Sequence, residues 1–122
     1  MLEQILEAAG FQLDTGLVNT VRPGELLERY RAEFVGVLDR YPVLRAWVFG
    51  SVARGEDLPE SDLDLLVELE PAASVVDIFG LDEDIARVLG CRVDVVTTTE
   101  VEGNRLLRRG IDRDVLPLAF AA

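Results

Sequence analysis

The sequence predicts an α/β-type (α+β) fold in which helices pack on one small sheet. Segments with the apolar spacing of amphipathic helices alternate with short apolar segments that are typical of strands. The chain has 122 residues, which is enough for one domain with its own core and too few for two full domains. Three segments have a clear strand pattern, so we expect the sheet to be small.

The N-terminal part of the chain predicts two helices and the first strand. Apolar residues recur at helical spacing over residues 2–9. A longer helix is expected to begin at Pro23, because proline is favoured in the first helical turn. Its apolar stripe consists of Leu27, Tyr30, Phe34, Val37, Leu38 and Tyr41. Pro42 ends this helix, and a strand follows over residues 43–49.

The next predicted elements are a polar connection and a second strand. Residues 50–61 contain glycine, proline and several charged side chains, which indicates a loop. Residues 62–69 alternate between apolar and acidic side chains, as expected for a strand with one buried face. Leu66 is the exception, since it is apolar at a position where the alternation predicts a polar residue.

The C-terminal part of the chain predicts a capped helix and a third strand. Ser74 and Asp77 have the spacing of a capping box, with Asp in place of Glu, and the helix that they open is expected to run to about Leu89. The third strand follows over residues 91–96. Two weaker segments complete the pattern, a short helix over residues 104–109 and an apolar segment over residues 115–120.

The charge of the chain restricts its partners. There are 23 acidic residues against 12 basic ones, a net charge of -11. Proteins that grip DNA or RNA use Lys and Arg to neutralise phosphates, so we expect no direct binding of nucleic acid. A small triphosphate escorted by a cation stays admissible, and a basic protein partner would be attracted.

Several further classes of site and location are excluded or disfavoured by composition. The chain has no histidine, which excludes His-ligated zinc and Ser-His or Cys-His nucleophilic sites within it. No apolar run approaches the ~20 residues of a membrane helix, and residues 1–10 lack the basic cluster of a signal peptide. Cys91 has no second cysteine to pair with. We therefore expect a cytoplasmic protein without a membrane partner.

The motif that carries chemistry has three parts in a fixed order. Gly50-Ser51 follows the first strand and offers close-approaching backbone and a hydroxyl to a phosphate. Asp62 and Asp64 stand at i and i+2 in the second strand, so they point to the same face. Asp94, in the third strand, can complete a site for hard divalent cations, which carboxylates hold together with substrate phosphates.

Each part also has an ordinary structural interpretation. Asp62 and Asp64 could be the solvated face of an amphipathic strand. The Gly-Ser pair could be a plain turn, and Asp94 could be an acid that caps a neighbouring amide. Arg54 could reach a triphosphate oxygen or be a solvated loop residue. The occurrence of all the acidic and Gly-Ser parts in one order, on suitable elements, favours a functional site.

The residues 48–55, Val-Phe-Gly-Ser-Val-Ala-Arg-Gly, followed by Ser-Asp-Leu-Asp-Leu-Leu-Val at 61–67, resemble the nucleotidyltransferase fold of DNA polymerase β. They are more similar still to the minimal nucleotidyltransferases, MNT, that act as antitoxins beside HEPN-domain ribonuclease toxins. The resemblance covers about residues 25–118 and includes the strand around Asp94. It implies a polymerase β-like fold, with a small mixed sheet and helices packed on it.

The resemblance also implies an activity and roles for residues. Asp62, Asp64 and Asp94 would be catalytic carboxylates that hold two Mg²⁺ ions. Gly50, Ser51 and Arg54 would contact the phosphates of ATP. The reaction would transfer AMP to a hydroxyl, which in the resembled antitoxins is a tyrosine of the HEPN toxin.

Two other functions stay open at this point. The chain could be a non-catalytic antitoxin that neutralises its partner by binding alone. It could also transfer nucleotides to a small molecule, as the aminoglycoside nucleotidyltransferases do. We further expect two regions, an N-terminal extension over residues 1–22 that resembles a remnant of a helix-turn-helix region, and a nucleotidyltransferase domain over residues 23–122.

Overall fold

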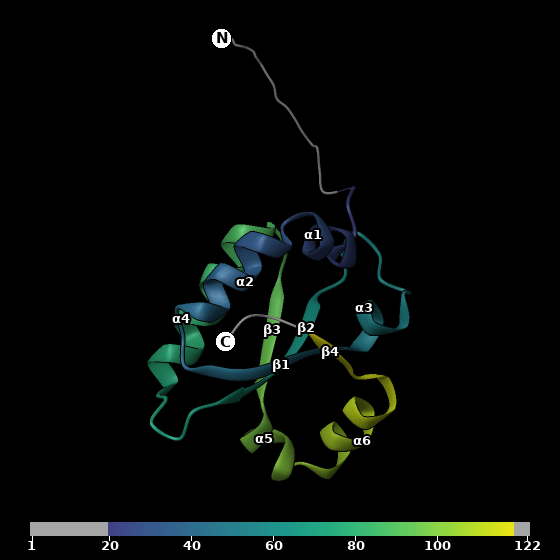
Figure 1. The fold of residues 1–122 in the computed structure, drawn as a ribbon. Coiled ribbons are helices and arrows are strands. Elements are labelled where there is room, and N and C mark those ends of the chain that lie inside the picture. The colour runs from purple at the N-terminus through teal and green to yellow at the C-terminus, as the bar shows by residue number, and fades with distance from the viewer. Residues whose placement is uncertain (1–19, 119–122) are drawn as a thin grey trace.

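A mixed sheet with the strand order β3-β2-β1-β4 forms the centre of the fold (Figure 1). The structure is a computed structural model, and it describes residues 20–118. β2 pairs antiparallel with β1 and parallel with β3, and β1 also pairs antiparallel with β4. The strands are β1 (Val43–Phe49), β2 (Leu63–Leu69), β3 (Val93–Thr97) and β4 (Leu116–Leu118).

The predicted α/β (α+β) class is confirmed, with six helices around the sheet in the described part of the chain. They are α1 (Pro23–Arg29), α2 (Arg31–Asp39), α3 (Gly50–Arg54), α4 (Val75–Leu89), α5 (Thr98–Glu102) and α6 (Arg105–Asp114). No helix of residues 20–118 is long and apolar enough to cross a membrane.

One face of the sheet is covered by α2 and α4, which lie side by side (Figure 1). The alternation of β2 sends Leu63, Leu65 and Val67 to this face, and all three are fully buried. Phe34 of α2 and Leu81 of α4 pack onto the same core. This burial of apolar surface is the main stabilising term for the position of β2.

The opposite face is covered by α5 and α6, and this explains the exception at Leu66. Leu66 is buried with Val96, Val101 and Ile111, and Trp47 packs against them. The polar face of β2 therefore becomes apolar in the middle of the strand, where these helices cover it. Asp64, closer to the start of β2, lies on the same face beyond this second core.

Several predicted elements differ from the observed ones. The long helix from Pro23 is divided at Tyr30, whose φ of -110° and ψ of 31° leave the helical region, so that α1 and α2 are separate helices. Residues 50–61 are not wholly a loop, because α3 opens them. α5 was not predicted, and α6 extends to Asp114, beyond the predicted end. The helix predicted over residues 2–9 lies outside the described residues.

Candidate active site

The register between β2 and β3 places Asp64 directly beside Asp94. These strands are parallel, so paired residues send their side chains to the same face of the sheet. Asp64 is half-buried and Asp94 is exposed at the edge strand. Two of the three predicted carboxylates therefore occupy neighbouring positions on one face.

Gly50 brings the start of α3 against the carboxylate of Asp64. β1 and β2 are antiparallel, and Phe49 pairs with Asp64, so the chain turns into α3 beside that side chain. Gly50 has a φ of +72°, which L side chains rarely adopt. A Cβ atom at Gly50 would overlap the Asp64 carboxylate oxygen and lie 3.2 Å from its Cγ. Glycine is thus required here for both conformation and space.

The environment of Asp64 is unfavourable to a negative charge. Burial, followed by the charges of Asp94 and Asp62, raises the pKa of Asp64 to about 6, and Arg54 acts in the opposite direction. Desolvation and like charges both disfavour an ionised carboxylate. A bound cation would remove this penalty, since it supplies the positive charge that the site lacks.

Asp62 differs from Asp64 and Asp94 because it forms an ion pair with an arginine. It lies just before β2, and its Oδ1 is 3.0 Å from Nη2 of Arg92. Arg92 also donates to the carbonyl oxygen of Glu60 at 3.0 Å. Within residues 20–118, no three His, Cys, Asp or Glu side chains group closely enough to hold one metal ion. The set of three aspartates as metal ligands therefore stays a prediction.

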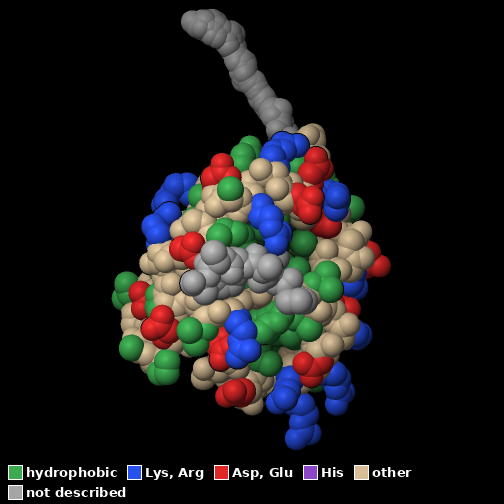
Figure 2. All heavy atoms as spheres, viewed as in Figure 1, with side chains coloured by type: hydrophobic (Ala, Val, Ile, Leu, Met, Phe, Trp, Pro, Cys, Tyr) green, Lys and Arg blue, Asp and Glu red, His purple; other side chains and the backbone are tan. Residues whose placement is uncertain are grey.

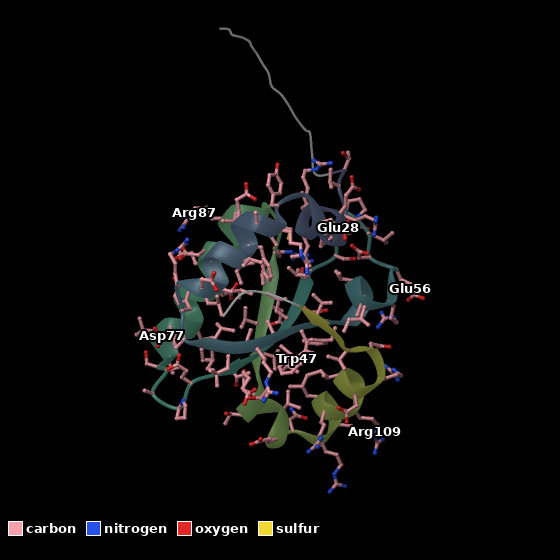
Figure 3. All side chains as sticks on the ribbon, in the orientation of Figure 1. Glu28, Trp47, Glu56, Asp77, Arg87 and Arg109 are labelled. Carbon is pink, nitrogen blue, oxygen red and sulfur yellow. The ribbon has the colours of Figure 1, made fainter. Side chains whose placement is uncertain are left out.

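Arg54, the last residue of α3, forms ion pairs with two acidic residues. Its Nε donates to Glu56 and its Nη1 to Asp114, both at 2.9 Å. Glu56 lies at the outer end of α3 in Figure 3. Ser51 is partly exposed in α3, and its carbonyl oxygen accepts from the amide of Glu56 at 2.9 Å. The predicted role of Arg54 toward phosphate stays a prediction, and it would require Arg54 to exchange at least one of these partners.

A small cavity of about 210 Å³ lies between α3 and α6, beside Gly50. Its lining combines apolar side chains from α6 with the charged groups of Arg54 and Asp114. The apolar part is formed by Phe49, Leu106, Leu107 and Ile111. Apolar walls with a few polar groups are also found in small-molecule sites, but the volume of this cavity is below the ~300–1,000 Å³ that is usual for them.

The donors at this site suit magnesium. Asp62, Asp64 and Asp94 offer carboxylate oxygens, the ligands that Mg²⁺ prefers, and Mg²⁺ is usually held by one or two carboxylates plus substrate phosphates. Burial, and then the charges of Asp94 and Asp62, raise the pKa of Asp64, and Arg54 offsets only part of this effect. The chemistry of these donors therefore fits a divalent cation, although the three carboxylates are not gathered around one point in the described residues.

Sequence reasoning did not identify three residues that organise the site. Arg92 pairs with Asp62, and Asp114 holds Arg54 across from α6. Asp57 is buried, and it accepts from Nη1 of Arg22 and from the amide of Gly24, each at 2.8 Å. Each of these contacts joins residues that are far apart in the sequence, so no local sequence pattern indicates it.

Comparison with known proteins identifies the family. The nucleotidyltransferase domain family matches residues 33–114, which include every residue assigned above to the candidate site. The chain belongs to this family. A Thermococcus cleftensis relative, the protein adenylyltransferase MntA, is 37% identical over 78 residues, which are 64% of this chain and 73% of that protein. A candidate protein adenylyltransferase of Methanocaldococcus jannaschii is 33% identical over 89 residues, 70% of this chain and 96% of the relative.

Solved structures agree with this nucleotidyltransferase assignment. A candidate minimal nucleotidyltransferase is 35% identical, with a TM-score of 0.65, and the match covers 83% of this chain and all of that one. A toxin–antitoxin complex with AMP-PNP contains a chain that is 18% identical, with a TM-score of 0.60 and coverage of 74% and 73%. At that identity the second match supports the fold alone. The predicted resemblance to minimal nucleotidyltransferases is confirmed, and the chain is a nucleotidyltransferase.

Proposed function

We propose that this nucleotidyltransferase transfers AMP from ATP to a tyrosine hydroxyl of a cognate HEPN toxin, and that it acts as an antitoxin by this modification. The observation that carries the proposal is the placement of Asp64 beside Asp94, with Gly50 against the Asp64 carboxylate. This arrangement combines crowded negative charge with a close backbone approach at the start of a helix. It suits a nucleoside triphosphate that arrives with its metal ions.

In the proposed reaction, the acceptor hydroxyl oxygen attacks the α-phosphorus of ATP. The new bond joins that oxygen to phosphorus, the bond from the α-phosphorus to the bridging oxygen breaks, and pyrophosphate leaves. The hydroxyl proton is released, so the products are an AMP ester, pyrophosphate and a proton. The chain itself forms no covalent bond, and its residues act by position and charge.

The three aspartates have the role of holding the metal ions. Asp62 and Asp64 would bind the ion that accompanies the triphosphate, and Asp94 would join them at the second ion. Two Mg²⁺ ions, when bound, stabilise the attacking and the leaving oxygens. Gly50, Ser51 and Arg54 would bind the departing pyrophosphate through the Gly50 amide, the Ser51 hydroxyl and the Arg54 guanidinium.

The proposal of a protein acceptor has three supports. Two relatives carry names of protein adenylyltransferases, and the chain covers 96% and 73% of their length. A structural neighbour is an MNT antitoxin in complex with a tri-AMPylated HEPN toxin of Shewanella oneidensis. The net charge of -11 also favours a basic protein over a polynucleotide as partner.

A second candidate function is neutralisation by binding alone. The ion pair between Asp62 and Arg92 favours it, because this pair occupies a carboxylate that the catalytic scheme requires for metal. In that case the acidic surface would mask the toxin, and nucleotide transfer would be dispensable.

The decisive experiment is co-expression with the product of the neighbouring gene, followed by intact-mass measurement of that product. We expect its mass to rise by one or more AMP units with the wild-type chain and not with Asp64→Asn. Asp39→Asn is the matched control, since it removes the same charge from an exposed position on α2. Toxin neutralisation that survives Asp64→Asn without any change of mass would instead establish binding alone. Transfer to small molecules only would contradict both.

A further inference from the structure

Three large apolar side chains are exposed at the N-terminal end of α4. Val75, Val76 and Phe79 retain 62%, 76% and 67% of their accessible surface. Phe79 lies three and four residues after the two valines, so the three side chains are neighbours on one helix face. We call these three residues the α4 patch. A group of exposed apolar side chains is typical of an interaction site, whereas single ones need no explanation.

The fold itself does not use the α4 patch. The buried face of α4 is formed by Leu81, Ile85 and Leu89, which pack into the core. The N-terminus of α4 is stabilised separately, because Ser74 and Asp77 form a capping box in which the Ser74 amide donates to Asp77 at 2.9 Å. The apolar side chains of the patch therefore contribute little to folding.

A groove beside the patch could receive a partner side chain. Its volume is about 270 Å³, and it is lined by Leu69, Glu70, Pro71, Ala73, Ile78, Thr97 and Thr99. Ile78 connects the groove to the patch, because it follows Val75 by three residues and is adjacent to it on the helix. The exposed valines and phenylalanine thus border a concave surface with mixed polar and apolar walls.

The sequence around the patch is acidic. Residues 70–86 contain five acids and no basic residue. Figure 2 shows hydrophobic and acidic side chains intermixed at this end of α4, while basic side chains gather toward its other end, where Figure 3 labels Arg87. A second copy of the chain would bring two acidic rims together, which like-charge repulsion disfavours. A partner with apolar side chains flanked by Lys or Arg is complementary.

We propose that the α4 patch and its groove are the docking surface for the protein that accepts AMP, an inference that rests on the proposed function. The acceptor would insert apolar side chains and surround them with basic residues. The patch follows the C-terminal end of β2, whereas Asp64 lies near the start of that strand. At about 3.3 Å per strand residue, the two regions are on the order of 15 Å apart. Docking is therefore separate from chemistry, and it selects the acceptor without contacting ATP.

The test uses the full chain with Val76→Ser and Phe79→Ser together, Asp64→Asn, and Leu44→Ser as control. Leu44 is also exposed, at 45%, and lies on β1, outside the three patch residues and outside the groove lining. The probe is the purified product of the neighbouring gene, its affinity measured by calorimetry and its AMP transfer by intact mass. Cooperative thermal unfolding, with melting temperatures no lower than that of the wild type, would show that the variants fold.

We expect the patch variant to bind the probe at least about tenfold more weakly and to raise KM for it by a similar factor, with KM for ATP unchanged. Leu44→Ser should match the wild type, and Asp64→Asn should bind the probe but not modify it.

Unchanged affinity in the patch variant would overturn the docking role, as would self-association that the variant abolishes. Absence of probe binding by the wild type would overturn both this inference and the proposed partner. Binding that depends on the patch without any AMP transfer would preserve the docking surface and overturn only the proposed reaction.

Discussion

Arg92 and Asp62 form an ion pair at the entrance to β2, with 3.0 Å between Nη2 and Oδ1. The pair competes with any cation for the Asp62 carboxylate. We predict that Arg92→Gln lowers the Mg²⁺ concentration for half-maximal AMP transfer. Because exposed ion pairs contribute little free energy, this Mg²⁺ concentration should fall by less than about fivefold. A magnesium titration of transfer activity measures it, with Arg87→Gln as control for loss of an exposed arginine on α4. An increased magnesium requirement in Arg92→Gln would contradict the competition.

We predict that Gly50→Ala disrupts the site more than a second glycine substitution with the same backbone strain. Gly50 and Gly55 both have a φ of +72°, but only Gly50 faces the Asp64 carboxylate, and a Cβ at Gly55 meets nothing within 4 Å. Gly55→Ala should therefore lose about 1–2 kcal/mol of unfolding free energy from strain alone. Gly50→Ala should lose more and should also lose transfer activity. Urea unfolding with an activity assay compares them, and equal losses in both measurements would show that the close approach to Asp64 is unimportant.

The crowding around Asp64 predicts a gain of stability when its charge is removed. Its pKa is raised from the ordinary value of about 4 to about 6, so in the absence of metal the stability of the fold falls as the pH rises through this range, and the full penalty is present above pH 6. Asp64→Asn should be more stable than the wild type at pH 8 in EDTA, by on the order of 1 kcal/mol after solvent screening. The difference should narrow by pH 5, because Asp64 is then protonated in the folded wild type. Urea unfolding at both pH values tests this, and a variant less stable than the wild type at pH 8 would contradict it.

A second pH-dependent contribution joins α2 to α4. The Tyr41 hydroxyl donates to Asp84 at 2.5 Å, and Arg87 and Arg40 also face this carboxylate, so that these contacts lower the pKa of Asp84. A lowered pKa stabilises the fold above the unfolded value of about 4, and this contribution is lost as the pH falls through the folded value. We predict that Tyr41→Phe lowers the urea midpoint at pH 7 and less so at pH 3.

Tyr30→Phe is the matched control for this measurement, since Tyr30 is also partly buried against the core. It should shift the midpoint equally at both pH values. A Tyr41→Phe effect that is the same at pH 3 and pH 7 would show that the bond to Asp84 does not depend on its charge.

The sequence predicted the elements with strong local signals. β1 has the predicted bounds, and α4 begins after the predicted capping residue Ser74 and ends at Leu89. Alternation in β2 also placed Asp64 correctly on the face opposite Leu63 and Leu65. These features depend on periodicity and capping, which a single sequence displays directly.

Other features depend on contacts between distant residues. The apolar stripe is continuous through Tyr30, so it could not reveal that the backbone there leaves the helical region. The polar composition of residues 50–61 concealed the short helix α3, which the positive φ of Gly50 introduces. The partners of Asp62 and Arg54 were not predictable, because neither Arg92 nor Asp114 stands in a motif with them.

The buried side chain of Asp57 gives the domain a mechanical coupling. Asp57 belongs to the loop that leads into β2 and Asp62, and it is bonded to Arg22 and to the Gly24 amide at the beginning of α1. A displacement of the chain at Arg22 would therefore pull directly on the loop that sets the position of Asp62. The beginning of α1 is thus joined to the loop before Asp62 by one carboxylate, so a force applied at Arg22 would be transmitted to the geometry of nucleotide transfer.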